Sequence, residues 1–187
     1  MESEFEALLG AMKRAAAALR DAGVEFALAG GVAVYARGGP ETTHDVDFIQ
    51  RQADAERALE ILQEAGFRSE TPPEGWLFKV FDEDDSMIDL IFAPNNRPEA
   101  VDGILERADE LEVYAIPLKV TSITDVLASK LLVLSDHNAD FEAPLTIARA
   151  CREQIDWDVV RRRTEDSPFA VAFIALAEEL GLTRAPA

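Results

Sequence analysis

Two aspartates separated by a single residue, Asp45 and Asp47, are the residues best suited to chemistry in this sequence. Their neighbours Val46 and Phe48 are apolar, which predicts a strand. Side chains two positions apart on a strand point to the same face, with Cα atoms roughly 6.5 Å apart. Two carboxylates held about 5 Å apart repel each other by roughly 3 kcal/mol at an effective dielectric near 20. A divalent cation removes that cost, and Mg²⁺ binds through one or two carboxylates plus substrate phosphates.

A glycine pair precedes these aspartates, and a third acid follows them. The strand predicted over residues 24–29 runs into Gly30 and Gly31, where a phosphate can approach the backbone without meeting a Cβ. Asp89 is the single acid in the apolar segment 87–92. An ionised carboxylate there is costly unless it is paired or metal-bound. We therefore expect the three acids to form a metal site and the glycines to contact a nucleotide.

This pattern of a glycine pair, a spacer, Asp45-x-Asp47 and a later apolar strand centred on Asp89 resembles the nucleotidyltransferase superfamily, which has a DNA polymerase β-like fold. The match covers roughly residues 24–92. The resemblance implies that the first two acids bind two metal ions, with Mg²⁺ or Mn²⁺ as the cofactor. It also implies that Asp89 completes the site and helps to activate the attacking hydroxyl.

Three further positions belong to the predicted site. Lys130 lies in an apolar helical segment, where a lysine either extends to solvent or reaches a triphosphate as a point charge. Asp140 starts the next predicted helix and could serve only as its N-cap. The pair resembles the end of AbiEii/MenT-type toxin nucleotidyltransferases, which implies nucleotide binding by Lys130 and catalysis by Asp140, with Asp136 as the alternative acid. Thr43 could contact a phosphate or serve in a turn.

The composition limits the class of protein. With 187 residues, 48% of them hydrophobic and 29% charged, the chain can bury the core of one domain with a helical extension. It lacks the stretch of about 18 apolar residues that a membrane span needs. The acidic start is unlike a signal peptide, and the single Cys151 excludes an internal disulfide. We expect a cytoplasmic protein with no membrane partner.

The net charge of −18 disfavours nucleic acid over most of the surface, because nucleic-acid binding depends on neutralising phosphates. The run Arg161-Arg162-Arg163 is the exception. It is either a solvated helix face or a local anion-binding patch. Arg51 and Lys79 are further candidates for phosphate contacts, because the expected fold places them near the acids.

Hydrophobic periodicity predicts an α/β (α+β) class: a small mixed-sheet core over residues 1–118, followed by a C-terminal helical bundle over 119–187 that closes one side of the cleft. In the core we expect helices over residues 4–21, 32–36, 53–65 and 97–108, and strands over 24–29, 45–49, 76–81, 87–92 and 111–116. In the second part we expect helices over residues 123–134, 141–153, 157–163 and 169–180.

The resemblances imply a metal-dependent enzyme that transfers a nucleoside monophosphate from a nucleoside triphosphate, ATP included, to a hydroxyl acceptor. The AbiEii/MenT pattern implies the 3′ end of a tRNA or a protein as acceptor, in a toxin–antitoxin system with an antitoxin-like partner protein. The segment Thr43-His44-Asp45-Val46-Asp47 is also similar to lincosamide-type antibiotic nucleotidyltransferases, which implies a small-molecule acceptor. A non-catalytic nucleotide-binding or partner-neutralising module is disfavoured, because we expect only a metal to offset the repulsion among the acids.

Overall fold

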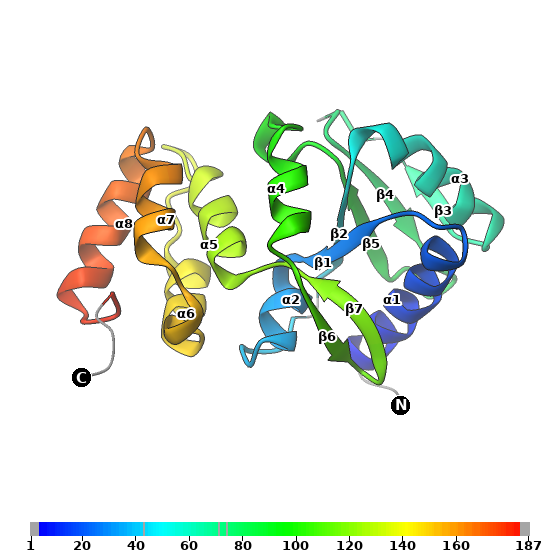
Figure 1. The fold of residues 1–187 in the computed structure, drawn as a ribbon, viewed down its shortest axis with the longest axis horizontal. Helices are drawn as coiled ribbons and strands as arrows, with labels where there is room; N and C mark the ends of the chain where they lie inside the picture. Colours follow the sequence, from blue (N-terminus) through cyan, green and yellow to red (C-terminus); the bar gives the residue numbers. More distant parts are fainter. Residues whose placement is uncertain (1–3, 43, 71, 74, 184–187) are drawn as a thin grey trace.

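A computed structural model of the chain describes residues 4–42, 44–70, 72–73 and 75–183, which fold into an α/β core and a helical half (Figure 1). Seven strands form one mixed sheet in the order β3-β4-β5-β2-β1-β7-β6, which confirms the predicted fold class. The strands are β1 (Phe26–Ala29), β2 (Val46–Gln50), β3 (Arg68–Glu70), β4 (Leu77–Phe81), β5 (Met87–Ile91), β6 (Asp109–Val113) and β7 (Ile116–Val120).

The helices fall into two groups (Figure 1). The core carries α1 (Glu4–Asp21), α2 (Gly30–Ala36), α3 (Ala55–Glu64) and α4 (Ala100–Glu106). The helical half contains α5 (Ile123–Leu132), α6 (Glu142–Ala150), α7 (Trp157–Thr164) and α8 (Pro168–Glu179), and short 3₁₀ turns are η1 (Gln52–Asp54), η2 (Pro94–Asn96) and η3 (Arg152–Gln154). Among the described residues, no helix combines the length and the apolar character that crossing a membrane requires. The predicted division at 118/119 falls inside β7.

The core differs from the prediction at two places. Strand β3 was not expected, because its three residues are polar and mostly exposed. The single strand expected over residues 111–116 is wrong: β6 and β7 form a hairpin that turns at Tyr114 and Ala115. Both turn residues have positive φ, 49° and 65°. Hairpin turns of this kind usually carry Asn or Gly, so Tyr114 and Ala115 are not residues from which a turn would be predicted.

Different helices cover the two faces of the sheet. Val46 and Phe48 are completely buried in the cluster that contains α1 and α3. Ile49, one residue further along β2, packs instead against Ile104 of α4. Because side chains alternate along a strand, Asp47 lies on the same face as Ile49 and α4. The acidic site is therefore built on the α4 side of the sheet.

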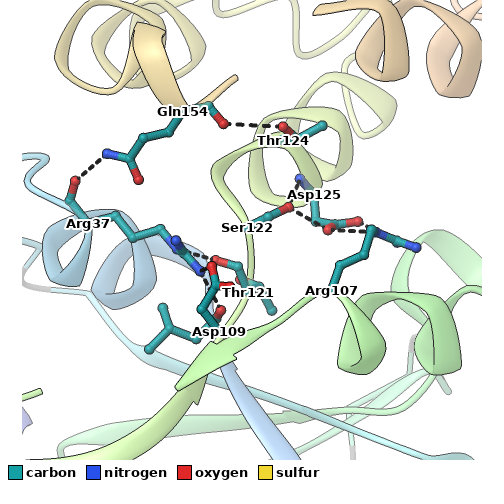
Figure 2. Close-up of polar contacts among 9 residues, drawn as sticks. Arg37, Arg107, Asp109, Thr121, Ser122, Thr124, Asp125 and Gln154 are labelled. Carbon is teal, nitrogen blue, oxygen red and sulfur yellow. Dashed lines mark hydrogen bonds and ion pairs between the residues drawn. The ribbon is translucent and has the colours of Figure 1, made fainter. Parts of the chain in front are cut away.

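The junction between the core and the helical half is fixed by Arg37, at the end of α2 (Figure 2). Its guanidinium donates hydrogen bonds to the carbonyl oxygens of Thr121 and Val120, at 2.7 and 2.8 Å. It also pairs with Asp109 on β6 at 2.7 Å. From the helical side, Gln154 donates to the Arg37 carbonyl at 2.8 Å. These bonds hold the segment between β7 and α5 against the core.

Candidate active site

Three carboxylates meet where β2 and β5 lie side by side. Strands β2 and β5 are parallel neighbours, and their register pairs Asp47 with Asp89. Asp45 directly precedes β2 and points to the same face. One carboxylate oxygen from each of the three residues lies within 4.8 Å of the others. The structure therefore brings together the acids that the sequence pattern selected, and their role as metal ligands stays a prediction.

The charges in this cluster perturb the pKa of Asp47. Burial, together with the negative charges of Asp45 and Asp89, raises this pKa from 3.8 to about 7. The positive charges of Lys130 and Lys79 oppose this rise. A carboxylate with so high a pKa is one that a neighbouring cation would stabilise. Three oxygen ligands at this spacing thus fit a divalent metal ion, which prefers carboxylate oxygens.

Lys79 already offsets part of the repulsion. It lies on β4 opposite Asp89, and its Nζ donates to both carboxylate oxygens of Asp89, at 2.9 and 3.0 Å. The expectation that only a metal could compensate the three acids is therefore wrong. Lys79 pairs with an acid of the cluster, and Arg51, the other candidate phosphate contact, pairs with Glu25 and Asp102.

Neither glycine of the pair has room for a Cβ. Gly30 has φ +58°, and a Cβ at this position would overlap the Asp47 carboxylate. At Gly31 a Cβ would come within 2.9 Å of the Thr42 side chain. Helix α2 begins directly at Gly30, earlier than predicted. Close packing against Asp47 and Thr42 therefore accounts for both glycines, whether or not they contact a phosphate. The predicted contact from Thr43 lies outside the described residues.

A cavity of about 260 Å³ opens against the acidic cluster. Gly30 and Asp47 form part of its wall from the sheet, and Lys130 contributes from α5. Most of the remaining wall is apolar and includes Ile49, Trp76, Ile91, Ile104, Val126 and Val133. Lys130 is half-buried and lines the cavity that contains Asp47, as the nucleotide-binding hypothesis requires. Trp76 both lines the cavity and packs against the buried cluster of Ala55, Phe92 and Ala93.

Asp140 lies elsewhere. It is exposed just before α6, and its carboxylate accepts a hydrogen bond from the Glu142 backbone at 2.8 Å. Asp136, the alternative acid, is also exposed. Neither acid is among the described residues that line this cavity. The catalytic assignment of Asp140 stays a prediction, and the geometry supports its other reading, as a local cap.

Asp125 is a residue of this region that the sequence analysis missed (Figure 2). It is 4% exposed, lines the cavity, and bonds to Arg107 at 2.8 and 3.2 Å and to Arg163. Burial alone would raise its pKa, but the hydrogen bonds from Arg107 and Ser122 and the charge of Arg163 hold the pKa below its usual range. The spacing Ser122-x-x-Asp125 before an apolar run is a capping-box signal. That signal could have located the helix start, but not the two arginines.

The family described as uncharacterised nucleotidyltransferase matches residues 3–186, so the chain belongs to this family of enzymes. No curated protein matches the sequence. The AbiEii/MenT resemblance stays a prediction.

Solved structures share the fold at low identity. ANT(2'')-Ia in complex with adenylyl-2''-tobramycin has a TM-score of 0.64 at 17% identity, over 88% of this chain and 95% of that chain. The lincomycin-bound lincosamide antibiotic adenylyltransferase LnuA has a TM-score of 0.54 at 13% identity, over 76% and 95%. An antigenic nucleotidyltransferase-like protein from Paracoccidioides brasiliensis has 0.52 at 16%, over 90% and 87%.

Proposed function

We propose that this protein transfers a nucleoside monophosphate from a nucleoside triphosphate to a hydroxyl group of a small molecule. The observation that carries this proposal is the cluster of Asp45, Asp47 and Asp89, whose carboxylate oxygens lie within 4.8 Å of one another beside a cavity that Lys130 also lines. In the reaction, a bond forms between the acceptor oxygen and the α-phosphorus. The bond from the α-phosphorus to the bridging oxygen breaks, and pyrophosphate leaves.

The residues around the first cavity would have different roles in the reaction. Asp45, Asp47 and Asp89 would hold the divalent cation, Mg²⁺ or Mn²⁺, which stabilises charge on the entering and leaving oxygens. Asp89 would orient the acceptor hydroxyl and accept its proton, directly or through water. Lys130 would neutralise phosphate charge from the helical side of the cavity. The apolar wall would exclude water around the base of the nucleotide.

A small acceptor suits this surface better than RNA. In the run Arg161-Arg162-Arg163, Arg161 pairs with Asp158 and Glu178, and Arg163 pairs with Asp125. Only Arg162 of the run forms no ion pair with a described residue, so the run does not present three unpaired charges to a phosphate backbone. The net charge of −18 repels a polyanion elsewhere. The tRNA, protein and antitoxin-partner hypotheses, like ATP as the donor and the cytoplasmic location, stay predictions.

The test is transfer of label from α-labelled nucleoside triphosphates, with Mg²⁺, to panels of hydroxylated small molecules, tRNA and protein. Asp47→Asn keeps the shape of the side chain and removes its charge, so we expect transfer to fall by roughly 100-fold or more while the protein stays folded. Asp84→Asn is the matched control, because Asp84 is an exposed acid in the β4–β5 turn. Near-normal transfer by Asp47→Asn would rule out this catalytic centre.

A further inference from the structure

A second cavity, of about 420 Å³, lies beside the first, between α4 and the helices α5 and α7. The two cavities have common walls, formed by Pro94, Asn95, Ile104, Asp125 and Ser129. A molecule that occupies the second cavity therefore lies next to the contents of the first. The proposed function leaves this second space without a role.

The second cavity collects positive charge in a strongly acidic protein. Four arginines line it, against three carboxylates: Arg97, Arg107, Arg162 and Arg163, and Glu99, Asp125 and Asp166. The chain as a whole carries a net charge of −18. The lining therefore has one positive charge in excess, whereas the chain as a whole is strongly negative. It favours an anionic ligand at this place.

The four arginines have different partners. Arg107 and Arg163 are held by the buried carboxylate of Asp125, whose side chain is 3% exposed, and this pairing fixes the shared wall of the two cavities. Figure 2 shows the contact between Arg107 and Asp125. Arg97 and Arg162 form no ion pair with any residue that the structure describes, and both are exposed. These two guanidinium groups are available to a ligand. A guanidinium binds a carboxylate or a phosphate through parallel hydrogen bonds.

We infer that the acceptor is a small hydroxylated molecule that carries a carboxylate or a phosphate, and that Arg97 and Arg162 bind this anionic group while the hydroxyl reaches into the first cavity. This inference rests on the proposed function for the identity of the ligand as acceptor. The cavity volume suits a small molecule. A polycationic acceptor would be repelled by the same arginines.

The donor triphosphate is also an anion, but we assign it to the first cavity and not to the arginines of the second. Of the acids that would hold its metal ion, Asp47 lines the first cavity together with Lys130, and no arginine is among the described residues of that wall. The arginines line the second cavity only. RNA is the other polyanion, and Glu99 and Asp166 in the same wall, with the acidic surface beyond, oppose an extended phosphate backbone. The separation of the two charged walls assigns the arginines to the acceptor.

The experiment uses the full chain and inorganic phosphate as the probe, with the Nε–Hε signals of the arginine side chains followed by NMR. We expect the signals of Arg97 and Arg162 to shift on titration. We expect the double variant Arg97→Gln/Arg162→Gln to bind phosphate about tenfold more weakly. Arg149→Gln is the matched control, because Arg149 is exposed on α6, lines neither cavity and forms no ion pair within the described part of the chain. It should bind phosphate like the wild type.

Two further arms separate the sources of the anion. Affinity for MgATP without acceptor should be unchanged in the double variant, and a parallel loss would place the donor triphosphate at these arginines and overturn the inference. Glycerol 3-phosphate should be a better acceptor of the nucleoside monophosphate than glycerol, or a better inhibitor of its transfer. The double variant should no longer distinguish between the two compounds. Displacement of phosphate by tRNA but not by glycerol 3-phosphate would overturn the inference in favour of RNA. Wild-type protein that binds phosphate at these arginines yet fails to bind MgATP would refute the proposed function and leave the anion site standing.

Discussion

At the scale of single residues, the Asp47 carboxylate is confined by a backbone that has no room for a side chain. A Cβ on Gly30 would overlap that carboxylate. We expect Gly30→Ala to displace Asp47, to abolish nucleotidyl transfer and to lower the free energy of unfolding by about 1–3 kcal/mol. Urea denaturation and metal titration measure the two effects.

Gly38→Ala is the control for this change. Gly38 also has a positive φ, +93°, but a Cβ there would meet no atom within 4 Å. It should lower stability through backbone strain and leave metal affinity unchanged. If Gly30→Ala and Gly38→Ala bound metal equally well, the overlap with Asp47 would not matter to the site.

The raised pKa of Asp47 makes the stability of the metal-free protein depend on pH. The folded-state pKa, about 7, lies above the ordinary value of 3.8. Between these values the folded state binds a proton that the unfolded state has lost, so the free energy of unfolding falls as the pH rises and becomes level above about pH 7. We expect urea midpoints in EDTA to be higher near pH 5 than near pH 8, apart from effects common to other acids.

Asp47→Asn should lose this component of the pH dependence, and it should gain stability relative to wild type near pH 8, where the charge repulsion is fully present. The exposed Asp84→Asn should keep the wild-type profile. Parallel pH profiles for wild type and Asp47→Asn would show that the cluster does not hold the proton on Asp47.

At the scale of helices and strands, Asp125 ties three elements together. It lies on α5, and its carboxylate pairs with Arg107 at the end of α4 and with Arg163 on α7. Removing one partner of a buried pair leaves charges without compensation. We expect Asp125→Ala to lower the free energy of unfolding by about 2–3 kcal/mol, discounted because both arginines are partly exposed, and to raise the KM for the nucleotide because α5 carries Lys130.

The matched control is Asp158→Ala on α7. Asp158 pairs with Arg161, and its side chain is 83% exposed. Surface pairs contribute about 0–1 kcal/mol, so stability and KM should stay close to wild type. Equal costs for the two variants, measured by urea unfolding, would mean that the Asp125 pairing does not couple the core to the helical half.

Local sequence patterns predicted most of the helices and strands. The remaining features depend on contacts between residues that are far apart in the sequence. Periodicity located α1 with its observed bounds, Glu4–Asp21, because one helix face is apolar and the residue pattern changes at Gly23. The three acids and Lys130 could be proposed because their types and spacing are local features. The pairing of Asp125 with Arg107 and Arg163 joins residues 18 and 38 positions apart. No local pattern predicts such contacts, so the second cavity could not be foreseen.

At the scale of the whole molecule, the first cavity has walls from both halves of the chain. Gly30 and Asp47 come from the core, and Lys130 comes from α5. Binding of the metal and of the nucleotide should therefore be coupled: each should tighten the other by about tenfold or more, because each supplies charge that the other lacks. Calorimetry with Mn²⁺ and a non-hydrolysable triphosphate, added in either order, measures this coupling.

Lys130→Ala should weaken nucleotide affinity in this experiment and leave the intrinsic affinity for Mn²⁺ nearly unchanged. Lys13→Ala on α1 is the control, since the half-buried Lys13 lies over the Tyr114 ring and is not among the described residues that line this cavity. Independent binding of metal and nucleotide in the wild type would contradict the two-ligand site.

The ion pair between Lys79 and Asp89 turns occupancy of the site into a competition. The lysine ammonium is tethered within hydrogen-bond distance of the carboxylate, 2.9 and 3.0 Å from its oxygens, so it competes intramolecularly at a high effective concentration. A free metal ion must displace the lysine by its own affinity for the carboxylates. A metal ion bound to a triphosphate is aided by the contacts that the phosphates make with the protein. Lys79 is also in place to re-form the pair when pyrophosphate leaves. We therefore expect the enzyme to hold little metal in the absence of nucleotide. After each turnover the Lys79–Asp89 ion pair should form again.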